Sequence, residues 1–292
     1  MIEGRFTPTA RRRRPSQWLL SGFIAAMFLA TFAASASKPE LIPGGWDASV
    51  ETNAFSVDHG AWQQLLDAHL KSHPTGINRF DYGALKASAA DRATLADYLA
   101  YLQSLDPRTF SRAEQKPYWV NFYNALTVKV VTDAYPVDSI KHIHESILPI
   151  PTGPWGDVHA EVAGMELTLD DIEHGILRPI WRDPRIHYAV NCASIGCPNL
   201  SPMVYTASNM ETQLEAGATE YINHPRGVDF VDEDFIVISG IYDWFVVDFG
   251  DSEKKVFEHL VQYAEPELAG RLEGFSGAVE YEYDWALNQP DQ

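Results

Sequence analysis

The order of the helical and strand-like hydrophobic patterns is the feature that most limits how this chain can fold. Apolar residues recur at helical spacing in residues 58–70, 95–102 and 111–134, whereas the first paired strand patterns appear only after residue 157. Because helices gather early and hairpins follow later, without an alternating strand–helix rhythm, the sequence predicts an α+β fold. We expect helices with two hairpins and a small antiparallel or mixed sheet.

Capping and breaking residues predict where the helices begin and end. Ser111 and Glu114 have capping-box spacing before an aromatic-rich stretch that should continue as a buried helix to Ala134, ahead of Pro136. Three further helices are expected to start at polar residues, namely Asp58, Asp170 and Thr206. Two more helices are expected near residue 244 and over residues 256–261.

Alternating patterns and turn residues predict the strands. Residues 158–162 and 165–169 flank Ala163-Gly164 and predict one hairpin, and residues 228–238 predict a second with its turn at residues 232–234. Residues 186–190 form a short apolar run of strand length that ends at Asn191-Cys192, and residues 279–283 alternate as a half-buried strand.

The N-terminus has the order of a secretion signal. A basic block at residues 11–14 precedes an apolar run at residues 18–32, which is shorter than the roughly 20 residues of a membrane span. Ala34-Ser35-Ala36 supplies the small residues of a cleavage site, although a retained anchor has a similar pattern. We therefore expect a signal peptide over residues 1–36, an extended segment over 37–56, and a single α+β domain over 57–292.

The charge of the chain excludes one class of partner. The net charge is −18, and removal of residues 1–36 takes away five Arg and one Glu, which leaves about −22. Such an acidic surface repels phosphate backbones, so we expect no nucleic acid partner, and no membrane contact after signal cleavage. The expected location is periplasmic or extracellular, as in exported bacterial proteins.

The two cysteines, Cys192 and Cys197, have three interpretations. In an exported protein a close pair is most simply a disulfide, which favours that form as the resting state. Alternatively, Cys192 is a nucleophile exposed at a strand end, with a base supplied by His174 or another histidine and oriented by Asn121, Asn124 or Glu173. His187 itself would face away from Cys192 on one continuous strand.

A metal site is the third interpretation, with the cysteines and a group of histidines as ligands. The histidines concerned are His142, His144 and His159. An H-x-H pattern alone is a weak signal, and the cysteine spacing is longer than the usual two residues between zinc ligands. We therefore expect neither a metal nor another cofactor.

Two amides and one helix face also have a structural and a functional interpretation. Asn121 and Asn124 lie three residues apart on one helix face, either as buried amides that bond loop backbone or as donors that line a cleft. Glu173 and Arg178 also have both interpretations, as an ion-paired helix face or as part of a functional site, and the ion-paired face is the commoner of the two in proteins.

Three motifs together resemble the domain of unknown function 547 family. They are WVNFYN at residues 119–124, RIHYAVNCASIGCP at 185–198 and YDWALN at 283–288, and the resemblance extends from about Trp62 to Asn288. The family is widespread in bacteria, often behind export signals, and occurs in plants beside coiled-coil segments. The resemblance singles out shared positions without assigning them roles: Asn121, Tyr123, Asn124, Glu173, Arg178, Arg185, His187, Cys192, Cys197 and Pro198.

These observations lead to two functional hypotheses. The first is a thiol-dependent hydrolase or acyltransferase that acts on amide or ester substrates through Cys192, with a distant histidine as in papain-like and transglutaminase-like enzymes. The second is a non-catalytic binding or scaffold domain with a Cys192–Cys197 disulfide. The partner would be a small molecule, a peptide or a protein. Substrate binding or support of the loop is expected from Arg178, Arg185, His187, Ser194 and Cys197.

Overall fold

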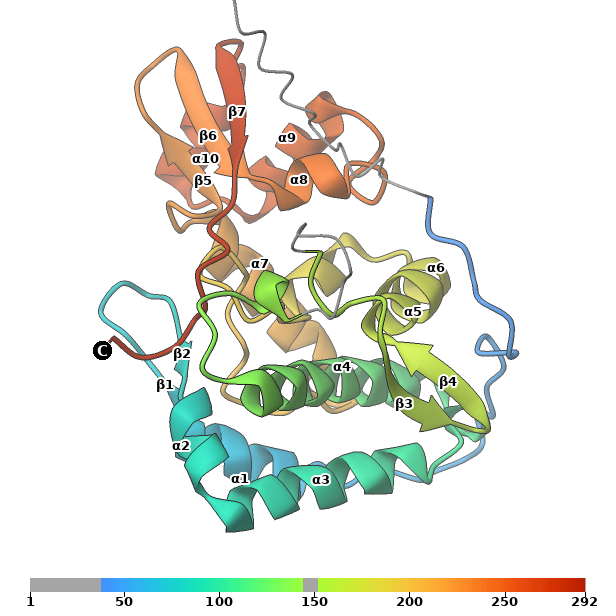
Figure 1. The fold of residues 1–292 in the computed structure, drawn as a ribbon. Helices are drawn as coiled ribbons and strands as arrows, with labels where there is room; N and C mark the ends of the chain where they lie inside the picture. Colours follow the sequence, from blue (N-terminus) through green and yellow to red (C-terminus); the bar gives the residue numbers. More distant parts are fainter. Residues whose placement is uncertain (1–37, 144–151, 292) are drawn as a thin grey trace, which may run out of the picture. The chain divides into compact units, whose positions relative to one another are not determined.

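The computed structural model describes residues 38–143 and 152–291, which belong to the unit Ala34–Gln292. The predicted signal peptide and its cleavage site lie outside the described residues, and so does His144. Within the described residues, helices and three small sheets confirm the α+β class (Figure 1). No helix in these ranges is long and apolar enough to cross a membrane.

Four helices of the first half pack together. They are α1 (Gly60–His69), α2 (Tyr82–Ala87), α3 (Ala89–Gln103) and α4 (Arg112–Ala134), and α4 contacts both α2 and α3 (Figure 1). All residues of α4 from 114 to 128 are buried, so its side chains meet protein all round. Its aromatic-rich sequence therefore lies at the centre of the larger of two hydrophobic cores.

The helix α4 begins and ends where the sequence predicts, but its capping differs. Ser111 is the N-cap residue without a side-chain capping bond. The Glu114 carboxylate instead accepts a hydrogen bond from the Val57 backbone N–H at 2.7 Å. Glu114 therefore ties the N-terminal segment to α4, and the expected capping box is not formed.

The first predicted hairpin is present and leads into an irregular helix. Strands β3 (Val158–Val162) and β4 (Met165–Thr168) pair antiparallel, with positive φ at both Ala163 and Gly164 in the turn. Thr168, rather than the expected Asp170, caps the following helix, because it forms a reciprocal capping box with Asp171. The helix runs through α5 (Leu169–Ile172), the π-helix η3 (Glu173–Leu177) and α6 (Arg178–Trp181).

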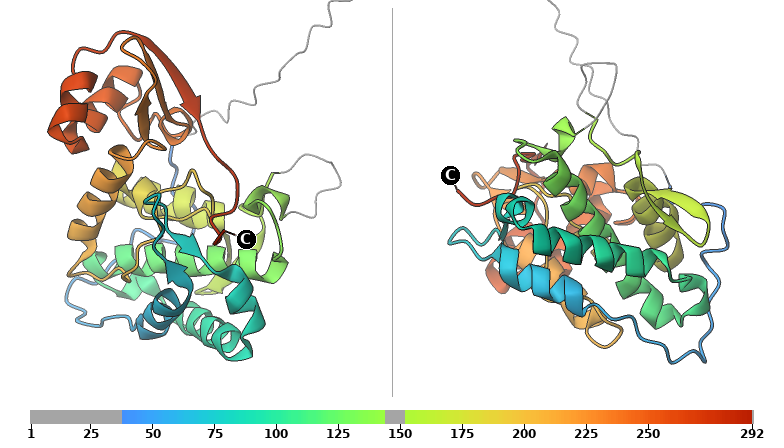
Figure 2. Two further views of the ribbon diagram at one scale, coloured as in Figure 1. Left: turned by 90° about the vertical axis from the view of Figure 1, so that its left-hand side faces the viewer. Right: turned by 60° about the horizontal axis from the view of Figure 1, so that its bottom comes forward.

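The second half of the chain forms a mixed sheet and a second hydrophobic core. Strand β6 (Phe235–Ser239) pairs antiparallel with β5 (Val228–Phe230) and parallel with β7 (Ala278–Glu282), which confirms the second hairpin and the final strand. Four helices accompany this sheet, namely α7 (Met210–Ile222), α8 (Ile241–Trp244), α9 (Glu253–Tyr263) and α10 (Pro266–Leu272). Figure 2 shows the chain leaving β7 and returning toward the helices of the first half.

The remaining elements are short. Strands β1 (Leu70–Lys71) and β2 (Arg79–Phe80) pair antiparallel, and the 3₁₀ turns are η1 (Pro107–Thr109), η2 (Ile140–His142) and η4 (Pro184–Tyr188). The predicted strand at residues 186–190 is wrong, because η4 occupies its first half. Pro184 at the first turn position and the Asp183 carboxylate, which accepts from the Arg185 N–H, favour that turn over a strand.

Candidate functional site

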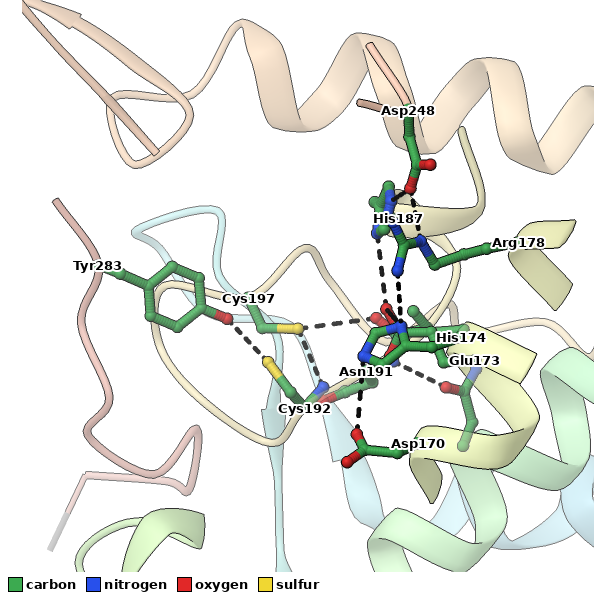
Figure 3. Close-up of polar contacts among 12 residues, drawn as sticks. Asp170, Glu173, His174, Arg178, His187, Asn191, Cys192, Cys197, Asp248 and Tyr283 are labelled. Carbon is green, nitrogen blue, oxygen red and sulfur yellow. Dashed lines mark hydrogen bonds and ion pairs between the residues drawn. The ribbon is translucent and has the colours of Figure 1, made fainter. Parts of the chain in front are cut away.

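The cysteine loop carries two free thiols (Figure 3). Cys192 is half-buried, whereas Cys197 is only 2% exposed. The Cys192 backbone N–H donates to the Cys197 Sγ at 3.1 Å, and the Cys197 thiol lies 3.7 Å from the Val190 carbonyl oxygen. The structure therefore differs from the expected disulfide, because both cysteines are free in it.

Local bonds and the C-terminal segment fix the shape of this loop. The Asn191 side-chain oxygen accepts a hydrogen bond from the Ala193 N–H, and Ala193 has a left-handed φ of 58°. Farther along, the Ile195 N–H donates to the Ala286 carbonyl and the Gly196 N–H to the Asp284 carbonyl, both at 2.8 Å. The returning C-terminal chain thus pairs with the loop and holds it in place.

Gly196 is required for this pairing, and substitution of it should be costly. A Cβ at Gly196 would lie 2.8 Å from the Asp284 backbone nitrogen, which is too close for any side chain. We expect Gly196→Ala to lower the free energy of unfolding by about 1 to 3 kcal/mol in urea denaturation. Gly270→Ala is the matched control, because its Cβ meets nothing within 4 Å and a helical Gly to Ala change gains about 0.5 to 1 kcal/mol. Equal stability of the two variants would contradict this reading of the loop.

Tyr283, just beyond β7, brings its hydroxyl to the reactive end of the loop. Its Oη lies 2.7 Å from the Cys192 Sγ and 3.0 Å from the Ser194 Oγ, and the Ser194 Oγ is 3.4 Å from the same sulfur. Burial raises the pKa of the Tyr283 hydroxyl well above its usual range, and the nearby Cys192 and Cys197 raise it further. Tyr283 therefore stays protonated and donates to the sulfur.

The thiol of Cys192 is easier to ionise than an ordinary cysteine. Burial raises its pKa, but hydrogen bonds from Cys197, Ser194 and Tyr283 outweigh burial and hold the pKa below its usual value. In contrast, burial raises the pKa of Cys197 well above its usual range, and the hydrogen bond and charge of Cys192 add to the effect. The loop thus contains one activated thiol and one protonated thiol.

A buried network of charged groups lies beside the loop (Figure 3). The His187 imidazole bonds the Asp248 carboxylate through Nε2 at 2.7 Å and lies 3.5 Å from the Glu173 carboxylate through Nδ1. Arg178 donates from Nε to Asp248 at 2.6 Å and from Nη1 to the His174 Nδ1 at 3.2 Å. The irregular helix α5–η3–α6 therefore supplies three members of the network, and π-turns of this kind are frequent at functional sites.

In this network the contacts with charged partners, and not burial, set the direction of the pKa shifts. Burial by itself raises the pKa of Glu173, but the charge of His174 and the hydrogen bond and charge of His187 lower it to about 2. Burial lowers the pKa of His187, and the hydrogen bonds to Asp248 and Glu173 outweigh it, so that its net shift is upward. The described polar contacts of His174 and His187 go to Asp170, Glu173, Arg178 and Asp248, whereas those of the Cys192 sulfur go to Tyr283 and Ser194.

Asn121 and Asn124 act as clamps on backbone in the structure. The Asn124 amide donates to the Ala189 carbonyl at 2.9 Å and accepts from the Asn191 N–H at 2.8 Å. Asn121 makes the same double contact with the backbone of Tyr205, at 2.8 and 3.1 Å. All of these groups are buried, so the two amides match the structural interpretation, in which buried amides bond loop backbone.

Arg185 lies in a separate ion-paired cluster. Its guanidinium contacts the Asp183 carboxylate at 2.9 Å and, on α7, Glu211 at 2.8 Å and Glu215 at 2.6 Å. Asp183 also pairs with Lys116 of α4 at 2.8 Å. Arg185 therefore supports the chain before the cysteine loop by joining two helices to η4.

Two residues of the site received no role from sequence reasoning. Tyr283 stood only in the expected final strand and in a family motif, and Asp248 was not singled out. Local patterns gave no signal for either, because both approach the site through long-range packing of the second core. Among residues 38–143 and 152–291, no group of three or more His, Cys, Asp or Glu could hold a metal ion.

Comparison with known families agrees with the first two motifs, at residues 119–124 and 185–198, whereas the third lies outside the matched residues. The model of the family described as "Protein of unknown function, DUF547" matches residues 107–222, which include α4, η3 and both cysteines. No curated protein and no solved structure matches the chain.

Proposed function

Residues 107–222 belong to the DUF547 family, and from the chemistry of their site we propose that the protein is a thiol-dependent hydrolase or acyltransferase. The substrates would be amides or esters, and Cys192 would be the nucleophile. The observation that supports this proposal most is the Tyr283 hydroxyl, which lies 2.7 Å from the sulfur of the half-buried Cys192, with the Ser194 hydroxyl 3.4 Å from the same sulfur. Such donors stabilise the thiolate, which is the nucleophilic form.

The proposed reaction has two steps. The Cys192 thiolate attacks the carbonyl carbon, and the C–N or C–O bond breaks to give a thioester and a leaving group that takes up a proton. Water or an acceptor nucleophile then cleaves the thioester and restores the thiol. Tyr283 suits the role of proton donor, because its hydroxyl is protonated and touches the reacting sulfur.

The histidines have different places in this proposal. The side chain of His187 is 2% exposed and is bound to two carboxylates, which suits support of the site. The side chain of His174 is 33% exposed, but its Nδ1 accepts from Arg178 and its Nε2 lies 3.6 Å from Asp170, so it would act as the base for water in the second step only after the Arg178 contact opens. Glu173 and Arg178 would orient His174, since Arg178 donates to its Nδ1.

The non-catalytic scaffold is the alternative function and has less support. It required a Cys192–Cys197 disulfide to fix the loop, but both cysteines are free in the structure. The loop shape is maintained instead by Asn124, the Asn191 side chain and the C-terminal segment.

Competitive alkylation tests the proposed nucleophile. With limiting iodoacetamide below pH 7, Cys192 should be modified much faster than Cys197, and a panel of activated esters and amides should yield a trapped acyl group on Cys192. Cys192→Ser should lose at least about 100-fold of any such activity. Cys197→Ser is the matched control and should retain the acyl adduct. Two equally slow thiols and the absence of an acyl adduct would contradict the proposal.

We also propose that the chain is exported and processed after Ala36. The basic block, short apolar run and small residues support this step. Protein recovered from the producing cell should begin at Ser37 and carry a net charge of about −22. An intact mass that still includes residues 1–36 would contradict the proposal.

A further inference from the structure

We infer a second activity for the cysteine loop, thiol–disulfide exchange, in which Cys192 attacks a disulfide substrate and Cys197 resolves the mixed disulfide. The inference rests on the same nucleophile as the proposed function but requires neither an ester nor an amide substrate. It arises from the position of a second thiol, Cys197, beside Cys192, because the proposed acyl chemistry needs only Cys192. The substrate class is a low-molecular-weight disulfide such as oxidised glutathione.

The two thiols are unequal in access. Cys192 is half-buried, whereas Cys197 is 2% exposed, so Cys192 is the more accessible residue of the two. The mixed disulfide therefore forms at Cys192 alone. Cys197 is placed to act only from inside, because its sulfur accepts the Cys192 N–H at 3.1 Å and its thiol lies 3.7 Å from the Val190 carbonyl oxygen.

The backbone brings the second sulfur back toward the first. Ala193 turns the chain through its left-handed φ, and the Cys197 N–H donates to the Ser194 carbonyl at 3.2 Å to close the next turn. The Asn124 amide and the paired C-terminal segment fix both sides of this loop. Closure to a disulfide therefore calls for a local change of the two side chains within a supported loop.

The exchange is balanced in atoms and electrons. The Cys192 thiolate attacks one sulfur of the substrate, an S–S bond forms, and one thiolate leaves. Cys197 then loses its proton to a departing thiolate and attacks the Cys192 sulfur, which releases the second thiol. The two cysteines are oxidised by two electrons, and the substrate disulfide is reduced to two thiols, one of which carries the proton from Cys197.

The electrostatics of the loop favour this order of events. Burial, the hydrogen bond to Cys192 and the charge of the Cys192 thiolate all raise the pKa of Cys197, so it stays protonated while Cys192 is free. A mixed disulfide at Cys192 removes that negative charge. Two of the three causes that keep Cys197 protonated then disappear, and the second thiol becomes available when it is needed.

Oxidised glutathione is the probe that tests the inference. The folded protein should end as an intramolecular disulfide with a mass lower by two hydrogens, and it should show a two-electron transition in glutathione redox buffers. Cys197→Ser should instead accumulate a mixed disulfide at Cys192, with a mass higher by one glutathione unit. Cys192→Ser is the matched control and should form neither the disulfide nor the adduct, because the remaining Cys197 is only 2% exposed.

The outcomes separate this inference from the proposed function. Rapid alkylation and acylation of Cys192 without closure of the pair would overturn the exchange and leave the hydrolase proposal standing. Closure without any acyl adduct would support the exchange and count against the hydrolase. A stable glutathione adduct on the wild-type protein would overturn the exchange. If Cys197→Ser fails to fold, as judged by circular dichroism, Cys197→Ala serves in the same assay.

Discussion

The His187→Ala variant should unfold with a free energy about 3 kcal/mol lower than the wild type, while Cys192 is alkylated at nearly the wild-type rate. His187 is buried between the Asp248 and Glu173 carboxylates and stacks on Phe245 at 4.2 Å. The substitution leaves two buried carboxylates with fewer partners and opens a cavity. The Cys192 sulfur is bonded to other groups, so its reactivity should change little.

The pH dependence of this loss has a definite sign. The pKa of His187 is raised in the folded protein, so its stabilisation is complete below about 6.5 and declines as the pH rises through the folded value. The pKa of Glu173 is lowered from 4.5 to about 2, so its stabilisation is complete above 4.5 and declines as the pH falls toward 2. The difference between wild type and variant should therefore be largest between pH 4.5 and 6.5.

Urea denaturation at a series of pH values measures this difference. His142→Ala is the matched control, since His142 is exposed and lies at the surface turn η2, and it should change stability by less than about 0.5 kcal/mol. A stability loss that is flat across this pH range would show that packing against Phe245, and not charge, is the main contribution of His187. A large fall in the alkylation rate with unchanged stability would make His187 the base instead.

The sequence predicted most of the regular elements, because each depends on short-range patterns. The long helix through residues 112–134, both hairpins and the final strand follow from hydrophobic spacing and turn residues that act within a few positions. The strand at residues 186–190 failed because apolar content alone does not separate a buried strand from a buried turn. At that position Pro184 and Asp183 decided the local conformation.

The candidate site was only partly predictable from sequence. Cys192 was singled out because it stood where a strand was expected to end ahead of a glycine-containing loop, although the 3₁₀ turn η4 lies there instead of the strand. Tyr283 and Asp248 were missed, because they follow Cys192 by 91 and 56 positions and approach the site only through packing of the second core. The state of the thiols could not be predicted either, since the spacing of Cys192 and Cys197 permits both a disulfide and two free thiols, and the structure has free thiols.

Replacing Asn124 with Ala should lower the free energy of unfolding by about 2 to 5 kcal/mol, because it leaves two buried backbone groups without partners. These groups are the Ala189 carbonyl and the Asn191 N–H, which the Asn124 amide joins at 2.9 and 2.8 Å. Each unsatisfied buried group costs about 1 to 3 kcal/mol. Asn53→Ala is the matched control and should cost less than about 1 kcal/mol, since water can replace its exposed bonds to Thr109 and Phe55.

The Asn124→Ala variant also distinguishes two roles of Asn124, a clamp on the backbone and a donor to the substrate. Asn124 holds the backbone on the N-terminal side of Cys192, so its loss should loosen the loop and expose Cys197 as well as destabilise the fold. We therefore expect the Asn124→Ala variant to lose the difference in alkylation rate between the two cysteines, measured by mass spectrometry under conditions in which the protein is still folded. Retained stability and retained selectivity, together with a loss of acyl transfer alone, would instead make Asn124 a donor to the substrate.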